Sequence, residues 1–169
     1  HRNTRRQRQM CIRDRNRVIK TDIPYLGICF GAQLLAKCLG SKITTNKDGL
    51  SEIGFYKIEP TENAKNLFNS QKIFFQFHSE GFSLPTGCEL LARGDIFNNQ
   101  AFKYQNCYAL QFHPEVNFKL HIRWLYLVLL KNPKKLFVKG AQNIFVQLYY
   151  RYKYNKNISN YIKTMYKKS

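Results

Sequence analysis

One stretch near the start of the chain restricts its fold more than any other, because a short apolar run passes through a cysteine directly into a helical pattern. The run Ile23–Cys29, opened by Pro24, is typical of a buried strand in a parallel sheet. Gly31–Leu39 then carries apolar residues at helical spacing, and Gly40 is placed to end the helix. A strand that leads at once into a helix predicts an α/β fold.

The junction itself reads Gly27-Ile28-Cys29-Phe30-Gly31. A nucleophile on such a sharp bend adopts a strained backbone, and side chains two residues to either side of it would collide, so we expect Gly27 and Gly31 to relieve the collision. The start of a helix favours a thiolate at Cys29, and the backbone N–H of Phe30 is expected to point to where an oxyanion would form. The alternative is a buried cysteine between two packing glycines.

A second candidate for chemistry is the segment Gln111-Phe112-His113-Pro114-Glu115, at the end of the predicted strand Tyr108–His113. Residues two apart in a strand face the same side, so Glu115 is expected to orient His113. Pro114 suits a strand end because it cannot donate to a sheet ladder. With Cys29, the pair would complete a cysteine–histidine–acid set. Without Cys29, a structural histidine would be the better interpretation.

The rest of the chain continues the α/β pattern. A turn is expected at Asp48-Gly49, and helices are expected from Asn117 to a break at Asn132-Pro133 and again over Gln142–Tyr150. In the first of these helices Leu120, Trp124, Leu127 and Val128 recur at helical spacing. The further predicted strands are Lys42–Thr45, Glu52–Glu59, Lys72–His78, Glu89–Ala92 and Gln100–Tyr104.

The charge is large but unevenly distributed. The net charge of +18 is carried by the flanks, because residues 1–20 contribute +7, residues 21–118 contribute −1 and residues 119–169 contribute +12. A near-neutral middle argues against nucleic-acid binding as the function of the domain. The tail Lys153–Ser169 could bind RNA or an acidic partner, although a solvated helical extension is the preferred interpretation.

Cysteine usage indicates a reducing compartment, so we expect a cytoplasmic protein. The chain has five cysteines, no secretory signal and no CxxC pair, and its longest apolar run, Trp124–Leu130, is too short for a membrane span. We expect no metal site and no cofactor. Cys38, Cys88 and Cys107 are expected to be buried, inert core residues.

Two segments carry a family resemblance. PYLGICFGAQLLAKCLG and YALQFHPEV resemble the two signature segments of class I glutamine amidotransferases, and QFHSEGFSLPTGCELLARG, NQAFKY and EIGFYKI are similar to a subgroup related to the glutaminase domain of GMP synthase. The resemblance implies a three-layer αβα, flavodoxin-like fold, incomplete at its N-terminus. Residues 1–15 resemble translated sequencing-adapter sequence. We therefore expect a non-native segment at 1–15, a partial amidotransferase domain at 16–131 and a basic helical extension at 132–169.

The resemblance also implies roles for single residues. Cys29 would be the nucleophile, His113 the base and Glu115 the orienting acid. The substrate-binding residues would be Gly27, Phe30, Gly31, Gln33, His78 and Ser79. For His78 a structural hydrogen bond is an equal alternative.

The implied reaction is hydrolysis of the glutamine side-chain amide through a glutamyl thioester, with ammonia passed to an acceptor on a synthetase partner. No GxxxxGK[ST] loop for ATP is present in the chain. The alternatives are hydrolysis of other γ-glutamyl bonds and a non-catalytic regulatory relative. Because a full domain has earlier strands and a second oxyanion donor, we expect the chain as printed to be inactive or poorly folded, which a glutaminase assay of both lengths would test.

Overall fold

The computed structural model describes residues 23–64, 66–68, 72–154 and 165 of the chain. The predicted non-native segment 1–15 lies outside these residues, as does most of the basic tail. The elements in chain order are β1 (Tyr25–Ile28), α2 (Phe30–Cys38), β2 (Ile43–Thr45), β3 (Glu52–Lys57), β4 (Glu59–Pro60), η1 (Glu62–Ala64), β5 (Ile73–His78), β6 (Glu80–Phe82), β7 (Glu89–Arg93), β8 (Ala101–Tyr104), β9 (Cys107–Leu110), α3 (Phe118–Lys131), η2 (Pro133–Phe137) and α4 (Ile144–Lys153).

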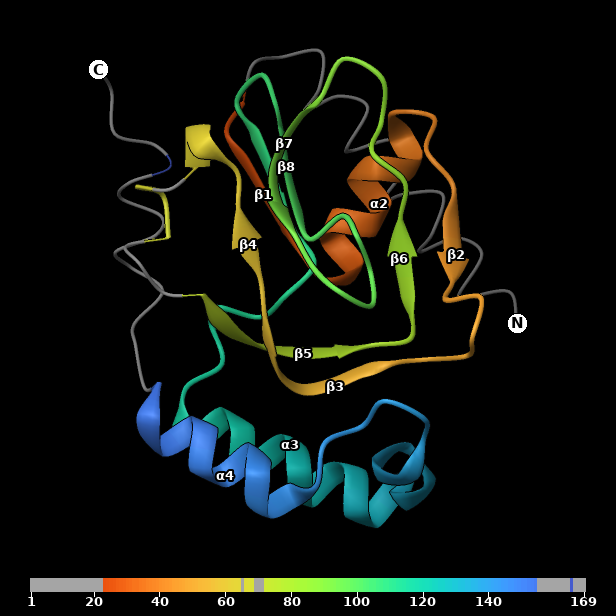
Figure 1. The fold of residues 1–169 in the computed structure, drawn as a ribbon, viewed down its shortest axis with the longest axis vertical. Helices are drawn as coiled ribbons and strands as arrows, with labels where there is room; N and C mark the ends of the chain where they lie inside the picture. Colours follow the sequence, from red (N-terminus) through yellow and green to blue (C-terminus); the bar gives the residue numbers. More distant parts are fainter. Residues whose placement is uncertain (1–22, 65, 69–71, 155–164, 166–169) are drawn as a thin grey trace.

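The main sheet has five strands in the order β1-β9-β8-β7-β4 (Figure 1). β1 runs parallel to β9, with Ile28 paired to Leu110, whereas the other pairs in this sheet are antiparallel. Since parallel neighbours end at the same edge of a sheet, the residues that follow β1 and β9 are brought together. The α/β fold expected from the sequence is therefore confirmed, with antiparallel strands added to it.

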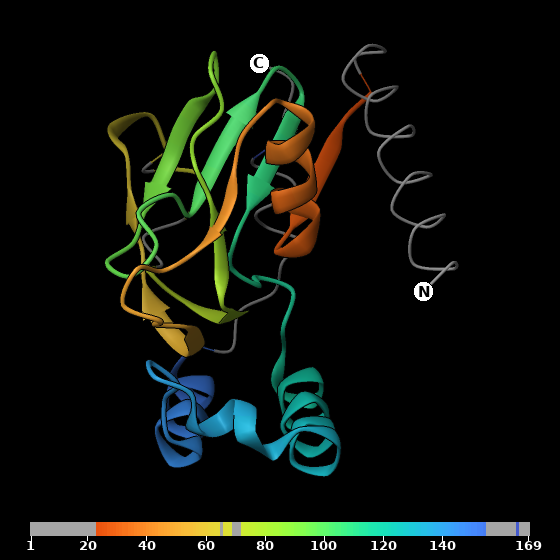
Figure 2. The same cartoon turned by 90° about the vertical axis from the view of Figure 1, so that its right-hand side faces the viewer.

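Each face of this sheet has its own apolar cluster, because side chains alternate along a strand. In β9, Cys107 and Ala109 belong to the cluster under α2, whereas Tyr108 and Leu110 belong to the cluster on the opposite face. Helix α2 buries Leu35 completely and lies along β1 and β9 on one side of the sheet (Figure 2). The predicted helix and the observed one agree to within one residue at each end.

A second layer is built on the antiparallel pair β3–β5, which crosses the end of the main sheet next to α3 and α4 (Figure 1). Helix α3 begins at Asn117, whose side chain accepts a hydrogen bond from the N–H of Leu120, and ends before Asn132, as predicted. Its buried residues are His121 and Leu125. Of the residues at helical spacing, Leu120 and Trp124 pack against the cluster of Phe55 and Phe75, whereas Leu127 is exposed.

One further expectation needs correction. Strand β9 ends at Leu110, so the predicted strand to His113 is three residues too long; beyond Leu110, the N–H of His113 donates to the carbonyl of Phe75 in β5 instead. The turn expected at Asp48-Gly49 is present, and the strands on either side of it pair with other strands, β2 with β6 and β3 with β5. No helix in the described parts of the chain is both long and apolar enough to cross a bilayer.

Candidate active site

Cys29 occupies the bend between β1 and α2 with a strained backbone. Its φ is 49° and its ψ is −106°, and within the described residues only Gln105 shares a positive φ among the non-glycine residues. The N–H of Cys29 donates to the carbonyl of Leu110 at 2.7 Å, which ties the bend to the end of β9. Its side chain does not cap α2, so the first N–H groups of the helix have no side-chain cap from Cys29. The strained backbone expected at this bend is confirmed, and Cys29 itself is half-buried.

The two glycines of the bend are not equivalent. A Cβ at Gly27 would lie 2.7 Å from the carbonyl carbon of Gly31, a contact that real side chains do not make. A Cβ at Gly31 would meet only the hydroxyl of Tyr25 at 3.5 Å, an ordinary van der Waals contact. The expected collision is therefore confirmed for a side chain at Gly27 and wrong for one at Gly31. The backbone of Gly31, rather than the space for its side chain, limits what fits at Gly27.

His113 lies between a carboxylate and the cysteine. Its Nδ1 is 2.7 Å from Oε1 of Glu115, and its ring meets the Trp124 ring edge-on with centroids 5.0 Å apart. Burial by itself lowers the pKa of His113, but hydrogen bonds to Cys29 and Glu115 outweigh it and raise the pKa to about 9. The expected pairing is present, although the reason given for it was wrong: both residues lie in a turn after β9 and not in a strand.

A chain of side-chain amides also reaches the sulfur. The Nε2 of Gln111 lies 3.8 Å from Sγ of Cys29, and the Oε1 of Gln111 is 3.4 Å from Nε2 of Gln33. The Nε2 of Gln33 donates to the carbonyl of Glu80 at 2.8 Å. Gln33 was expected at the site. Gln111 was not expected there, although its position two residues before His113 could have indicated a place near the site.

A pocket of about 270 Å³ opens beside Cys29. This volume is below the 300–1,000 Å³ that is usual for drug-sized ligands, so it suits a small molecule such as an amino acid. Of the six residues expected to bind substrate, Phe30, Gln33, His78 and Ser79 line it, whereas Gly27 and Gly31 shape the bend behind it. The remaining lining residues are Ser51, Ile53, Phe77, Glu80, Lys135 and Val138.

Lys135 and Val138 come from a part of the chain in which the sequence analysis predicted no site residue. Residues 133–142 return to β3: the N–H of Ser51 donates to the carbonyl of Lys139, and the side chain of Gln142 bonds the backbone of Phe55 in both directions. This return places one wall of the pocket more than a hundred residues downstream of Cys29. Such a contact is long-range and has no local pattern.

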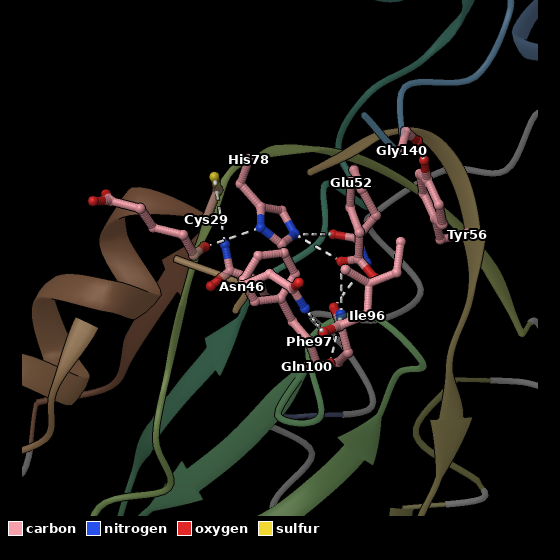
Figure 3. Close-up of polar contacts among 12 residues, drawn as sticks. Cys29, Asn46, Glu52, Tyr56, His78, Ile96, Phe97, Gln100 and Gly140 are labelled. Carbon is pink, nitrogen blue, oxygen red and sulfur yellow. Dashed lines mark hydrogen bonds and ion pairs between the residues drawn. The ribbon is translucent and has the colours of Figure 1, made fainter. Parts of the chain in front are cut away.

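His78 also lines the pocket, and its ring extends toward Glu52 (Figure 3). Only 3% of its side chain is exposed, and its Nε2 is 2.9 Å from Oε2 of Glu52, which is 1% exposed. Both of the interpretations left open for His78, a pocket residue and a structural hydrogen bond, are therefore compatible with its position. The partner Glu52 was not singled out in the sequence.

The other cysteines differ in their burial. Cys107 is buried, as expected, but Cys38 and Cys88 are only half-buried, because α2 and the 83–88 loop end at the surface. Burial raises the pKa of Cys88 to about 11, which keeps this thiol protonated and unreactive. Within the described residues, no group of three or more histidine, cysteine, aspartate or glutamate side chains could hold a metal ion.

An α/β fold in which a strained strand-to-helix bend presents a cysteine beside a histidine–carboxylate pair is the arrangement expected of enzymes whose cysteine nucleophile is activated by a histidine. A family model narrows this class. The model for "Glutamine amidotransferase class-I" matches residues 3–132, and the chain belongs to this family.

Comparisons with individual proteins agree with this assignment. The chain is 32% identical over 99 residues to one subunit of the glutamine-hydrolysing GMP synthase of Methanobrevibacter smithii, covering 57% of this chain and 52% of that protein. It is 36% identical over 107 residues to the GMP synthase of Campylobacter jejuni, covering 59% of this chain and 20% of that protein. The chain thus spans about half the length of the curated GMP synthase subunits that it matches.

Solved structures show the same fold. A glutamine amidotransferase from Thermotoga maritima matches with a TM-score of 0.76 and 27% identity, covering 91% of this chain and 67% of that one. A glutamine amidotransferase from Methylobacillus flagellatus, at 22% identity and a TM-score of 0.69, covers 92% and 65% and supports the fold alone. The flavodoxin-like α/β fold expected from the sequence is therefore confirmed.

Proposed function

We propose that the protein hydrolyses the side-chain amide of glutamine, with Cys29 as the nucleophile, His113 as the general base and acid, and Glu115 as the residue that orients His113. The observation that carries this proposal is the position of His113, which is hydrogen-bonded to Glu115 at 2.7 Å on one side and to Cys29 on the other. The names of its relatives, glutamine-hydrolysing GMP synthases, support glutamine as the substrate.

In the proposed reaction the thiolate of Cys29 attacks the carboxamide carbon of glutamine. The C–N bond breaks as His113 gives its proton to the nitrogen, so that ammonia leaves and a γ-glutamyl thioester remains. A water molecule then loses a proton to His113 and attacks the thioester, which releases glutamate and restores the thiol. The N–H of Phe30, the first of helix α2, is available to stabilise the oxyanion in both steps.

The pocket supplies the proposed contacts to the substrate. Phe30, Gln33, His78 and Ser79 line it next to the sulfur, while Gly27 and Gly31 allow the bend to form. Lys135, the one lysine or arginine among the lining residues, is suited to attract the α-carboxylate of the substrate.

We further propose that the ammonia is passed to a synthetase partner in the cytoplasm, because a relative is named as one subunit of a synthase. In this proposal residues 16–131 form the amidotransferase part and residues 132–169 a basic extension. Residues 133–142 of that extension nevertheless contribute to the pocket, so the two parts act together.

Glutamate and ammonia released from glutamine would be measured with the wild-type protein and with Cys29→Ala at both lengths, because the shorter, printed chain is expected to have little or no activity. We expect hydrolysis that is lost in the variant, together with a single adduct at Cys29 after exposure to a glutamine-like diazoketone. γ-Glutamyl dipeptides form the comparison arm: a higher kcat/KM for a dipeptide than for glutamine would favour the alternative γ-glutamyl hydrolase. An unlabelled Cys29 and no hydrolysis of either substrate would refute the enzymatic proposal.

A further inference from the structure

Four polar side chains form a closed cluster beneath the pocket: Glu52, Gln76, His78 and Gln100. All four are buried, and Glu52 is the one carboxylate among the described residues that is buried. Figure 3 shows Glu52 receiving contacts from the His78 ring and from Gln100. A buried carboxylate is costly unless it is paired, so the cluster has to supply both hydrogen bonds and positive charge.

The orientation of each amide in this cluster follows from its neighbours. The Nε2 of Gln100 lies 2.8 Å from Oε2 of Glu52 and 3.1 Å from the carbonyl oxygen of Phe97, and since both are acceptors this atom has to be the donor. The Oε1 of Gln100 then accepts from Nε2 of Gln76 at 2.7 Å. The Oε1 of Gln76 is therefore left as an acceptor, and it faces His78 at 3.0 Å.

Every atom that faces the ring nitrogens of His78 is consequently an acceptor. Its Nε2 lies 2.9 Å from Glu52 and 3.0 Å from Gln76, and its Nδ1 lies 3.0 Å from the carbonyl oxygen of Glu80. A neutral imidazole has one N–H and could satisfy only one side of this arrangement. The geometry therefore fits a doubly protonated His78 whose charge is balanced by Glu52.

The cluster reaches the pocket through one peptide carbonyl. The oxygen of Glu80 accepts from Nδ1 of His78 at 3.0 Å and from Nε2 of Gln33 at 2.8 Å. Gln33 is one helical turn from the nucleophile, since its N–H donates to the carbonyl of Cys29 at 3.0 Å. Ser79 and Glu80 line the pocket, so this part of the wall is held between the buried His78 ring and the helix that begins at the nucleophile.

We propose that His78, kept charged by Glu52, is a positioning residue that fixes the Ser79–Glu80 wall for substrate binding and takes no part in bond cleavage. The proposal rests on the glutaminase function proposed above. If Glu52 loses its charge, the proton on His78 loses its counter-ion, and a neutral ring keeps only one of its two N–H bonds. In the tautomer that keeps its proton on Nε2, the Glu80 carbonyl is held by Gln33 alone, and the pocket wall is free to shift.

The central variant is Glu52→Gln, which preserves the shape of the side chain and removes only its charge.

Two reagents separate substrate binding from the reactivity of the sulfur. A glutamine-like diazoketone has to occupy the pocket before it reacts, whereas iodoacetamide alkylates Cys29 without binding in the pocket. Because losing a buried hydrogen bond costs about 1–3 kcal/mol, we expect the half-saturating diazoketone concentration and the KM for glutamine to rise by roughly 5- to 150-fold. The maximal labelling rate, kcat and the iodoacetamide rate should change by less than about threefold.

Two further variants keep the result interpretable. Asn46→Ala removes the hydrogen bond that Asn46 donates to the carbonyl of Ile96 and the one that it accepts from the N–H of Asp48, both outside the cluster, and should leave KM unchanged. The double variant Glu52→Gln/His78→Leu has no ring nitrogen left without a partner, so its melting temperature should recover relative to Glu52→Gln while KM stays high. A KM that recovers together with the melting temperature would overturn the proposal, because it would make the pair a purely structural one.

The two proposals fail in different ways. A wild-type protein that hydrolyses glutamine, combined with a Glu52→Gln variant of unchanged KM and unchanged half-saturation, overturns the positioning role and leaves the glutaminase standing. An equal fall in the iodoacetamide rate and in kcat would also overturn it, because it would place His78 in the chemistry of Cys29. A wild-type protein with no hydrolysis and no diazoketone labelling refutes the proposed function itself.

Discussion

The backbone N–H of Cys29 donates a hydrogen bond to the carbonyl oxygen of Leu110 at 2.7 Å, and this contact joins the two sequence segments that are proposed to carry the chemistry. Leu110 is the last residue of β9, and Cys29 follows directly on its parallel neighbour β1. His113, three residues beyond Leu110, is thereby brought to the sulfur. The site is thus a consequence of one parallel strand pair and its register.

The two glycines of the bend should respond differently to alanine. Gly27→Ala forces a Cβ against the backbone of Gly31, so we expect loss of Cys29 labelling or of stable folding. Gly31→Ala meets only an ordinary contact, and alanine is favoured over glycine in a helix by about 1 kcal/mol, so its melting temperature should be unchanged or higher. Thermal unfolding and diazoketone labelling of both variants provide the measurement. Equal damage in the two would contradict the geometry of the bend.

Removing the proposed base, His113, should lower kcat more than removing the charge of Glu115, which orients it. General acid–base catalysis contributes about 10²–10⁴-fold, so His113→Asn should lower kcat by that order. Glu115→Gln retains a hydrogen-bonding atom beside His113, and we expect a smaller loss. Glu89→Gln, at an exposed carboxylate of β7, is the control and should leave kcat unchanged. The proposed roles are wrong if the order of the two losses is reversed.

Stability should depend on pH through His113. Its pKa in the folded protein is about 9, above the ordinary value of 6.5. The contribution of protonated His113 to the free energy of unfolding is therefore fully present below about pH 6.5 and is lost as the pH rises toward 9. The slope in that interval should be at most about 1.4 kcal/mol per pH unit. Urea unfolding at several pH values would measure it. His113→Gln should lack this part of the slope, and identical pH profiles would contradict the assignment.

Lys135 is expected to affect substrate binding, although it lies in the C-terminal part of the chain. It is exposed, so an ion pair with a substrate carboxylate should contribute about 0–1 kcal/mol, and Lys135→Ala should raise KM up to about fivefold. Lys134→Ala is the matched control, because Lys134 is in the same short helix but does not line the pocket. The effect should shrink at high salt. An equal rise in KM for both variants would indicate a general effect of charge.

Gly140 should not tolerate a side chain, because the side chain would overlap a neighbouring residue in addition to straining the backbone. Gly140 and Gly87 both have positive φ, at 94° and 76°, where an L-residue is strained by about 1–2 kcal/mol. A Cβ at Gly140 would also overlap the carbonyl oxygen of Ser51, which lines the pocket, whereas nothing lies near Gly87. Gly140→Ala should therefore lower the melting temperature more than Gly87→Ala and should raise KM as well. Similar melting temperatures would argue against the docking of residues 138–142 on β3.

Much of this site was predictable because several of its parts depend on residues that are close together in the sequence. The bend at Cys29 needs a strand pattern, a helix pattern and Gly27 within a few residues, and Glu115 lies two residues from His113. Such features depend on short-range backbone geometry, which the order of residues specifies directly. The pairing of Glu115 with His113 was found even though the strand assumed for it ends at Leu110, because a turn can also bring neighbours together.

The remaining parts were decided by contacts between distant segments. Register between β3 and β5 sets Glu52 opposite His78, and the return of residues 133–142 to β3 brings Lys135 to the pocket. No local periodicity encodes either contact, because a glutamate in a strand and a lysine in a short helix look the same whether they face solvent or a site. The sequence by itself determined the strand, the bend, the helix and the reactive side chains. Only the tertiary structure decided what surrounds them, since burial and pairing depend on the packing of the whole chain.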